Sequence, residues 1–288
     1  MSTDSASSGD DFLQVMATAS TARLDAARAN IDVATIAAQA TARPAPPPLQ
    51  LSGAGFDLIA EVKKRSPSAG RLAADALSPV DQASRYAQAG AAAISVLTEP
   101  SRFDGSLDDL QQVVDALPAV PVMRKDFLVD PYQVFEARAA GAGGVLLIAA
   151  MLTPEQLRHM LQTTFSLGMF ALVEAFDTQD LEHCVPVLEE FLPAVDDHGH
   201  CRLLLGINCR NLRTLDVEFE RFFPVLKQLP TSLPRVAESG VDSMERAERV
   251  AAAGYELALV GTALMRSEDP GQAAAELIQA GRTAADGV

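Results

Sequence analysis

Residues 56–70, FDLIAEVKKRSPSAG, begin as an apolar run and turn abruptly to charge at Glu61. If the apolar run is a β-strand, alternate side chains face opposite sides, so Ile59, Glu61 and Lys63 share one face. A carboxylate and an ammonium on the face that carries Ile59 are then directed toward an interior. Two further cations and a turn-forming Ser-Pro-Ser-Ala-Gly string follow. The stretch by itself fits two interpretations, a site for an anionic substrate or a strand end with solvated charges.

From residue 56 onward, a short apolar run, a polar or glycine loop and a longer helical stretch alternate along the chain. Strands are predicted over 57–62, 92–97, 121–124, 144–148, 169–174, 202–207, 235–237 and 256–260. Helices are predicted over 79–89, 106–116, 131–140, 154–166, 177–191, 219–228, 243–252 and 270–282. Eight repeats of about 25 residues fit an α/β fold of the (β/α)8 TIM barrel type. A doubly wound sheet is the competitor, but it needs a glycine fingerprint after the first strand, which Lys63-Lys64-Arg65-Ser66 is not.

Several of these helices carry boundary signals in the sequence. Proline follows a helix-capping residue at four helix starts, which are Ser78, Asp130, Thr153 and Asp269. Glycine stands where the chain must leave four helices, at Gly90, Gly141, Gly168 and Gly254.

The first 50 residues differ in character from the rest. Residues 1–10 are rich in serine and aspartate and are expected to be disordered. From residue 11 to about residue 40, apolar residues at near-helical spacing predict one or two helices, which the prolines of residues 43–48 end. We therefore expect a disordered tail and an N-terminal helical extension over 1–50, and a barrel domain over 51–288. The extension is expected to pack over the barrel mouth and to help shape a phosphate site.

The composition excludes several classes of protein. The formal net charge is −15 over 288 residues, which argues against binding to nucleic acid or to an anionic membrane. No stretch approaches the ~18 apolar residues of a membrane span, and the N-terminus lacks the regions of a signal peptide. Three cysteines make no disulfide framework, so a cytoplasmic protein is expected. A monomer is expected, with weak self-association as the alternative.

Polar side chains stand at seven of the eight predicted strand ends. They are Glu61 and Lys63, Thr98 and Glu99, Arg124 to Asp126, Glu174, Asn208 to Arg210, Glu238 and Ser239, and Gly261 and Thr262. In a (β/α)8 barrel the carboxyl ends of the strands form the active-site mouth. The pattern predicts two lysines, several carboxylates and an amide around that mouth. The small residues after the last two strands predict a phosphate site, where glycine lets the backbone approach and hydroxyls add donors.

These motifs closely resemble those of the indole-3-glycerol phosphate synthase family, the ring-closing enzymes of tryptophan biosynthesis. The matching segments are Ile59–Ser68, Leu97–Glu99, Phe103–Ser106, Arg124–Phe127, Leu172–Glu174, Gly206–Leu212, Glu238–Gly240 and Val260–Met265. The resemblance covers about residues 56–266, in order and at the matching strand ends. It implies a phosphorylated substrate, 1-(o-carboxyphenylamino)-1-deoxyribulose 5-phosphate, which is converted to indole-3-glycerol phosphate, CO2 and water.

The resemblance also implies roles for the polar side chains around the mouth, which are called the polar ring below. The lysine matching Lys125 is the general acid at the substrate carbonyl oxygen, which requires an ammonium held near that oxygen and a pKa not far above the working pH. Lys63 matches a lysine that contacts the substrate carboxylate and shares in proton transfer. Glu174 matches the general base and acid of the dehydration, and Glu61 matches a carboxylate that orients a lysine.

The same resemblance assigns the binding residues. Asn208 would hold a substrate hydroxyl or an intermediate, and Glu238 would sit in the same ring. Arg210 is a candidate partner of the substrate carboxylate, since a guanidinium binds carboxylates bidentately. Phe103 would cover the anthranilate ring. The phosphate would be bound by Ser66, Ser239, Gly240, Gly261 and Thr262. Acid–base chemistry on an activated aromatic amine implies neither a metal nor a cofactor.

Three features invite other readings. The segment 191–201 is longer than expected, and the loop should lie away from the mouth. The spacing of His183, Cys184, His198, His200 and Cys201 matches no standard zinc finger, so no metal site is expected. Cys209 has no histidine near it in sequence to activate it as a nucleophile, and is read as a spacer facing the barrel wall. Two rival functions remain, a Schiff-base aldolase that uses Lys63 or Lys125 and a non-catalytic barrel that binds a phosphorylated ligand.

Overall fold

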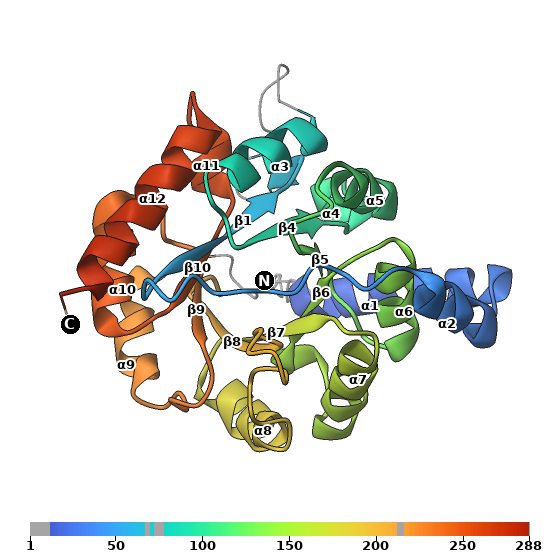
Figure 1. Ribbon diagram of the computed structural model, residues 1–288. Coiled ribbons are helices and arrows are strands. Elements are labelled where there is room, and N and C mark those ends of the chain that lie inside the picture. The colour runs from blue at the N-terminus through green and yellow to red at the C-terminus, as the bar shows by residue number, and fades with distance from the viewer. Residues whose placement is uncertain (1–11, 67–69, 72–77, 212–215, 288) are drawn as a thin grey trace, which may run out of the picture.

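The computed structural model describes residues 12–66, 70–71, 78–211 and 216–287, and the tail expected to be disordered lies outside these residues. Parallel strands close into a barrel, and helices surround it (Figure 1). The barrel strands are β1 (Asp57–Val62), β4 (Ala93–Leu97), β5 (Val122–Lys125), β6 (Gly144–Ile148), β7 (Phe170–Ala175), β8 (Leu203–Asn208), β9 (Arg235–Glu238) and β10 (Leu257–Val260). The predicted (β/α)8 fold is confirmed, with each predicted strand end within one residue of the observed one.

The helices on the outside of the barrel follow the predicted order. They are α3 (Pro79–Gln88), α5 (Leu107–Ala116), α6 (Pro131–Ala139), α7 (Pro154–Ser166), α8 (Thr178–Glu189), α9 (Phe222–Leu226), α10 (Met244–Ala253) and α12 (Pro270–Ala285). Side chains of all four predicted capping residues accept hydrogen bonds from backbone N–H groups of the first helical turn. One prediction was too long: residues 219–228 form a 3-10 turn, η2 (Phe219–Arg221), followed by the short α9.

Short elements at the strand ends were not predicted. They are the hairpin strands β2 (Arg65–Ser66) and β3 (Gly70–Arg71), the 3-10 turn η1 (Ala149–Met151), and the helices α4 (Pro100–Phe103) and α11 (Thr262–Arg266). Segments of two to five residues carry too few positions for a hydrophobic period to be recognised.

The alternation of side chains along each strand divides the barrel into two cores. Along β1, Leu58, Ala60 and Val62 face outward and pack in the layer between strands and helices. Ile59 faces the barrel interior, where it packs with residues such as Met123 and Leu146 of neighbouring strands. The charges that follow on the inward face of β1 are therefore directed to the open, carboxyl end of the barrel, as the sequence predicts.

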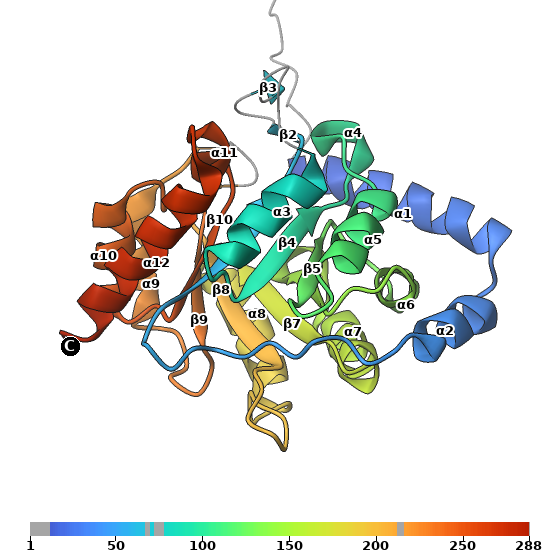
Figure 2. The same cartoon turned by 45° about the horizontal axis from the view of Figure 1, so that its top comes forward.

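The N-terminal extension forms two helices, α1 (Phe12–Asn30) and α2 (Val33–Ala42). α1 lies across the carboxyl ends of the strands, and α2 packs beside α6 (Figure 2). Met16 of α1 is 1% exposed and joins the interior core of the barrel. The prediction that the extension covers the mouth is confirmed.

Arg23 ties α1 to the strand ends on one side of the mouth. Its guanidinium lies 3.2 Å from Glu99 Oε1 and 2.7 Å from Asp126 Oδ1. These two carboxylates follow β4 and β5, and both are buried. α1 therefore contacts the side of the mouth next to β4 and β5. That the extension also shapes the phosphate site stays a prediction.

The chain between α2 and β1 passes beneath the barrel, at the end opposite the mouth (Figure 2). There Leu49 is 1% exposed, and its carbonyl accepts a hydrogen bond of 2.8 Å from the N–H of Cys201. This contact places the long segment 191–201 at the closed end of the barrel, away from the mouth, as predicted. Among the described residues, no cluster of ligating side chains could hold a metal ion, and no helix is long and apolar enough to cross a membrane.

Candidate active site

A cavity of about 670 Å³ opens at the carboxyl ends of the strands. Most of the residues that the sequence singles out line it: Glu61, Lys63, Phe103, Lys125, Glu174, Asn208, Arg210, Glu238, Ser239, Gly240, Gly261 and Thr262. Ser66 has its backbone in the hairpin strand β2, and its side chain lies outside what the structure describes. The tertiary structure thus brings together residues that are spread over 200 positions of sequence.

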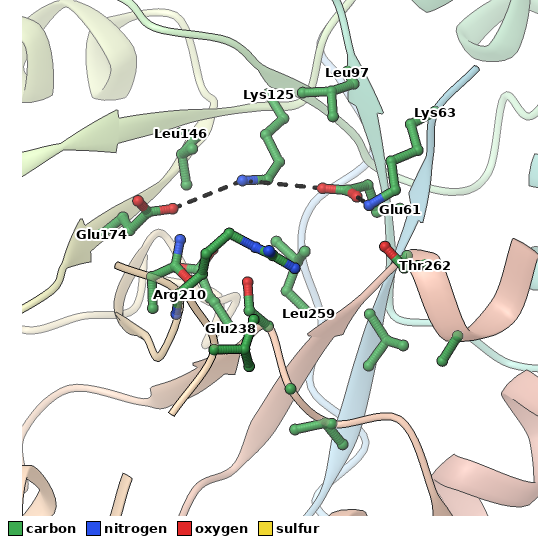
Figure 3. Close-up of a pocket in the computed structure, with 18 of the residues that line it drawn as sticks. Glu61, Lys63, Leu97, Lys125, Leu146, Glu174, Arg210, Glu238, Leu259 and Thr262 are labelled. Carbon is green, nitrogen blue, oxygen red and sulfur yellow. Dashed lines mark hydrogen bonds and ion pairs between the residues drawn. The ribbon is translucent and has the colours of Figure 1, made fainter. Parts of the chain in front are cut away.

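Lys125, at the end of β5, lies between two carboxylates (Figure 3). Its Nζ is 3.7 Å from Glu174 Oε2 and 4.0 Å from Glu61 Oε2. The other oxygen of Glu61 accepts a hydrogen bond of 2.6 Å from Lys63 Nζ. Glu61 therefore bridges the two lysines, as expected of a carboxylate that orients them.

The charges of this cluster stabilise one another. Burial opposes the charge on Lys125, but the nearby carboxylates, those of Glu174 and Glu61 foremost, outweigh it and raise the pKa of Lys125. Burial likewise opposes the charge on Glu61, yet Lys63 and Lys125 lower the pKa of this carboxyl. At neutral pH, Lys125 is an ammonium and Glu61 a carboxylate. The raised pKa keeps a proton on Lys125, but it is a shift away from the pKa near the working pH that suits a general acid.

The pKa of Glu238, at the end of β9, is shifted in the opposite direction from that of Glu61. Burial raises the pKa of Glu238 well above its usual range, and the neighbouring carboxylate of Glu174 adds to the rise. Lys125 opposes the shift without cancelling it. Within the described residues, neither carboxyl oxygen of Glu238 has a hydrogen-bond partner. A protonated carboxyl at this position can donate a hydrogen bond that an ionised one cannot.

Two glycines make room for these carboxylates. A Cβ at Gly206 of β8 would collide with Glu238 Oε1, and a Cβ at Gly261 would collide with Glu61 Oε1. Any side chain at either position would push a carboxylate out of place.

Asn208 and Arg210 extend the ring along β8. Asn208 is 4% exposed, and its Oδ1 accepts a hydrogen bond of 2.9 Å from the N–H of Arg210. This bond fixes the turn that follows β8. The Arg210 side chain lines the cavity next to Glu238 (Figure 3).

The cavity has an apolar side and a backbone-rich side. Phe103 and Phe127 lie with their ring centroids 6.3 Å apart, and Phe12 of α1 meets Phe127 edge-on at 5.9 Å. All three rings line the cavity and form an aromatic wall suited to a planar ligand group. Ser239, Gly240, Gly261 and Thr262 line the cavity at the ends of β9 and β10.

Comparisons with known proteins agree with this geometry. A family model described as indole-3-glycerol phosphate synthase matches residues 13–277. An indole-3-glycerol phosphate synthase of Mycolicibacterium gilvum is 43% identical over 263 residues, covering 90% of this chain and 91% of the relative. The chain belongs to the indole-3-glycerol phosphate synthase family. Synthases of Mycobacterium tuberculosis (43% identical, 90% of this chain and 91% of the relative) and Rhodococcus opacus (42%, 89% and 90%) are similarly close.

More distant solved structures share the fold alone. The 3-hexulose-6-phosphate synthase of Salmonella typhimurium is 15% identical, with a TM-score of 0.60 over 78% of this chain and 98% of that one. The thiamine phosphate pyrophosphorylase of Pyrococcus furiosus is 16% identical, with a TM-score of 0.54 over 80% of this chain and 97% of that one.

Several residues that line the cavity were not predicted from the sequence. Apolar ones, such as Phe12 and Ile148, resemble ordinary core residues, and no pattern distinguishes them. Arg246 and Arg266 lie on helices after β9 and β10 and line the cavity as well. They belong to helical stretches, where a charged residue usually marks a solvated face.

Two polar residues at strand ends do not line the cavity with the others. Arg124 is 3% exposed and points outward, where its guanidinium binds Asp126 at 3.1 Å and Glu136 at 3.3 Å. Glu99 is 0% exposed and accepts hydrogen bonds from the first N–H groups of α4. Residues at strand ends alternate between the cavity and the outer layer, and only the structure shows which face each takes.

The shifted pKa of Glu238 predicts a pH-dependent effect on stability. The folded state keeps this carboxyl protonated to a higher pH than the unfolded chain does, so stability is lost as pH rises from the usual glutamate value toward the raised one. Glu238→Gln removes that loss. We expect its Tm to match wild type near pH 4.5 and to exceed it by about 2 °C or more at pH 8, as measured by thermal unfolding.

A matched variant makes the comparison specific. Glu245→Gln changes an exposed glutamate of α10 and should leave the Tm difference from wild type constant across the same pH range. A Tm of Glu238→Gln that follows wild type at every pH would show that Glu238 ionises normally in the folded protein.

Proposed function

We propose that this chain catalyses the ring closure of 1-(o-carboxyphenylamino)-1-deoxyribulose 5-phosphate to indole-3-glycerol phosphate, with Lys125 as the general acid. The observation that carries the residue assignment is the ammonium of Lys125, held between Glu61 and Glu174 inside a cavity large enough for the substrate. Membership of the family supplies the reaction and the phosphorylated small-molecule substrate.

Ring closure begins at the substrate carbonyl. Lys125 donates a proton to the carbonyl oxygen, which makes the carbon electrophilic enough for the aromatic ring to attack. Lys63 and Arg210 bind the carboxylate on the aromatic ring, and Phe103 covers the ring itself. Bringing both reacting centres together in one bound conformation supplies much of the acceleration.

Loss of CO2 restores the aromatic ring, and loss of water completes the indole. Glu174 is the base and acid of the dehydration, the role that the family pattern implies for it, and its carboxylate lies on the far side of Lys125 from Glu61. Asn208 and Glu238 hold the substrate hydroxyls or the intermediate. Both side chains are buried at the ends of neighbouring strands, so their positions are defined by the barrel.

The phosphate binds at the ends of β9 and β10. Ser239, Gly240, Gly261 and Thr262 provide backbone N–H groups and hydroxyls, and Ser66 completes the set of residues that the family pattern assigns. This places the phosphate and the aromatic ring at different parts of one cavity, with the reacting carbons beside Lys125 between them.

The electrostatics disfavour the Schiff-base alternative. A nucleophilic lysine must lose its proton, usually because burial or a neighbouring cation lowers its pKa. Lys125 has carboxylates on both sides that raise its pKa, and Lys63 is bound to Glu61 at 2.6 Å. Lys125 is therefore not placed to act as a neutral amine, and the Lys63 ammonium is engaged by Glu61.

The proposal is tested by incubating the purified protein with the ribulose phosphate substrate and following indole fluorescence. We expect fluorescence to appear with one CO2 released for each indole formed. Absence of indole, together with a covalent adduct trapped by borohydride and a keto-phosphate, would instead support the aldolase.

We further propose that the chain acts as a cytoplasmic monomer, with residues 1–50 as the extension and 51–288 as the catalytic barrel. The three cysteines are buried and form no disulfide.

A further inference from the structure

The turn that follows β9 has an unusual backbone. Ser239 and Gly240 are consecutive residues with positive φ angles of 64° and 71°. Glycine adopts such left-handed conformations freely, but a residue with a Cβ does so at a cost in energy. Strain of this kind persists where the surrounding structure holds it, often at ligand sites. Both residues line the cavity.

Both carbonyls of this turn are held by side chains. Cys209 Sγ donates to the oxygen of Ser239 at 3.3 Å, and Arg246 Nη1 donates to the oxygen of Gly240 at 2.9 Å. Because a trans peptide is planar, its N–H points away from its C=O. The contact of Cys209 therefore directs the N–H of Gly240, and the contact of Arg246 directs the N–H of Val241.

These two N–H groups are available for a ligand. Among the residues that the structure describes, neither the N–H of Gly240 nor that of Val241 has a hydrogen-bond acceptor. Val241 also lines the cavity. Successive N–H groups of a turn form an anion-binding concavity, provided that the carbonyls of the same peptides point elsewhere.

We propose that Cys209 and Arg246 are positioning residues that direct the N–H groups of Gly240 and Val241 at the phosphate of the substrate. The inference rests on the proposed function, which places a phosphate at this end of the cavity. Neither residue needs to touch the phosphate. Each acts by holding a carbonyl that would otherwise be able to turn inward and repel the anion.

The Cys209 thiol is buried and protonated, as this contact requires. Its side chain is 0% exposed, and a Cβ on Gly240 would lie only 2.7 Å from its sulfur. Burial raises the pKa of the Cys209 thiol to about 12, against the opposing effect of nearby arginines. The thiol therefore keeps its proton and remains a donor at neutral pH.

Arg246 is held from three sides. Besides Gly240, its Nη1 binds both carboxylate oxygens of Asp242 at 3.0 Å. Its guanidinium carbon lies 4.7 Å from the centroid of the Phe219 ring. Asp242 offsets its charge, so the hydrogen bond to the Gly240 carbonyl is its specific contribution to the turn.

The test separates phosphate binding from chemistry. Cys209→Ala and Arg246→Met each remove one donor, and we expect KM to rise about 3- to 10-fold, the loss of one hydrogen bond. The inhibition constant for inorganic phosphate should rise by the same factor, while kcat stays within about 2-fold. Arg246→Lys keeps a donor of more similar reach and should restore much of the affinity.

Matched variants control for packing and charge. Cys201→Ala removes another buried thiol that donates to a backbone carbonyl, that of Leu203, at the closed end of the barrel. Arg249→Met removes a neighbouring arginine of α10 whose guanidinium lies 4.9 Å from the same Phe219 ring. Neither change should alter KM or inhibition by phosphate.

Three results would overturn the inference. Wild-type values of KM and phosphate inhibition in both Cys209→Ala and Arg246→Met would show that these side chains do not fix the orientation of the two carbonyls. A loss of Tm and kcat with unchanged phosphate inhibition would assign both residues a structural role. Equal losses in Arg246→Lys and Arg246→Met would show that a donor at this position does not hold the turn. Failure of the proposed function is distinct, because the wild-type protein would then form no indole.

Discussion

Lys125→Met should lower kcat roughly 10²- to 10⁴-fold, the usual contribution of a general acid, with a much smaller change in KM. Methionine keeps most of the length and packing of the side chain but removes the ammonium that donates a proton to the carbonyl oxygen. The ammonium acts mainly in the transition state, where the oxygen gains negative charge, so binding of the ground state is less affected. Steady-state kinetics by indole fluorescence measures both constants.

Lys64→Met is the matched control for this prediction. Lys64 is an exposed lysine at the same mouth, bound to Asp109 at 2.7 Å rather than to the carboxylates of the cavity. Its replacement should leave kcat within about 2-fold of wild type. If Lys125→Met also keeps a kcat near that of wild type, Lys125 is not the general acid and Lys63 becomes the remaining lysine of the ring.

Glu174→Gln should stop the reaction after CO2 has left and before water does. Glutamine preserves the size of the side chain but can neither accept nor donate the proton that dehydration requires, so indole formation should slow roughly 10²- to 10⁴-fold. In a single turnover, release of CO2 should then run ahead of the appearance of indole. Measuring both products in the same reaction tests this order.

The ratio of the two products distinguishes the roles that Glu174 can have. If CO2 and indole still form in equal amounts, and both form more slowly, Glu174 acts in ring closure through its contact with Lys125. Glu182→Gln, an exposed change on the helix that follows the same strand, should leave both products at wild-type rates.

The fold was predictable from sequence because its signals are local and repeated. Alternation along residues 57–63 placed Ile59, Glu61 and Lys63 on one face, and in the structure all three lie on the inner side of the barrel. Capping residues and prolines marked the helix starts because these groups satisfy N–H donors within a single turn. Lys64 and Arg65, which adjoin the ring in sequence, are exposed.

The composition of the polar ring was predictable too, because a parallel barrel brings all its strand ends to one mouth. The sequence could not show which neighbouring residues turn away. Arg124 occupies a strand end like the others, yet it faces the outer layer because side chains alternate along β5. Glu99 lies beyond the end of β4, where the chain has already turned into α4, and it caps that helix.

The sequence by itself determined the repeat, the inward face of the first strand and the chemical groups at the mouth, because each depends on neighbours within a few residues. Only the tertiary structure decided that Lys125 lies between Glu61 and Glu174, that Glu238 is buried beside Glu174, and that α1 adds Phe12 to the cavity. Those facts depend on distances between segments far apart in the chain. The pKa of each group, and hence the direction of proton transfer, follows from these distances and from burial.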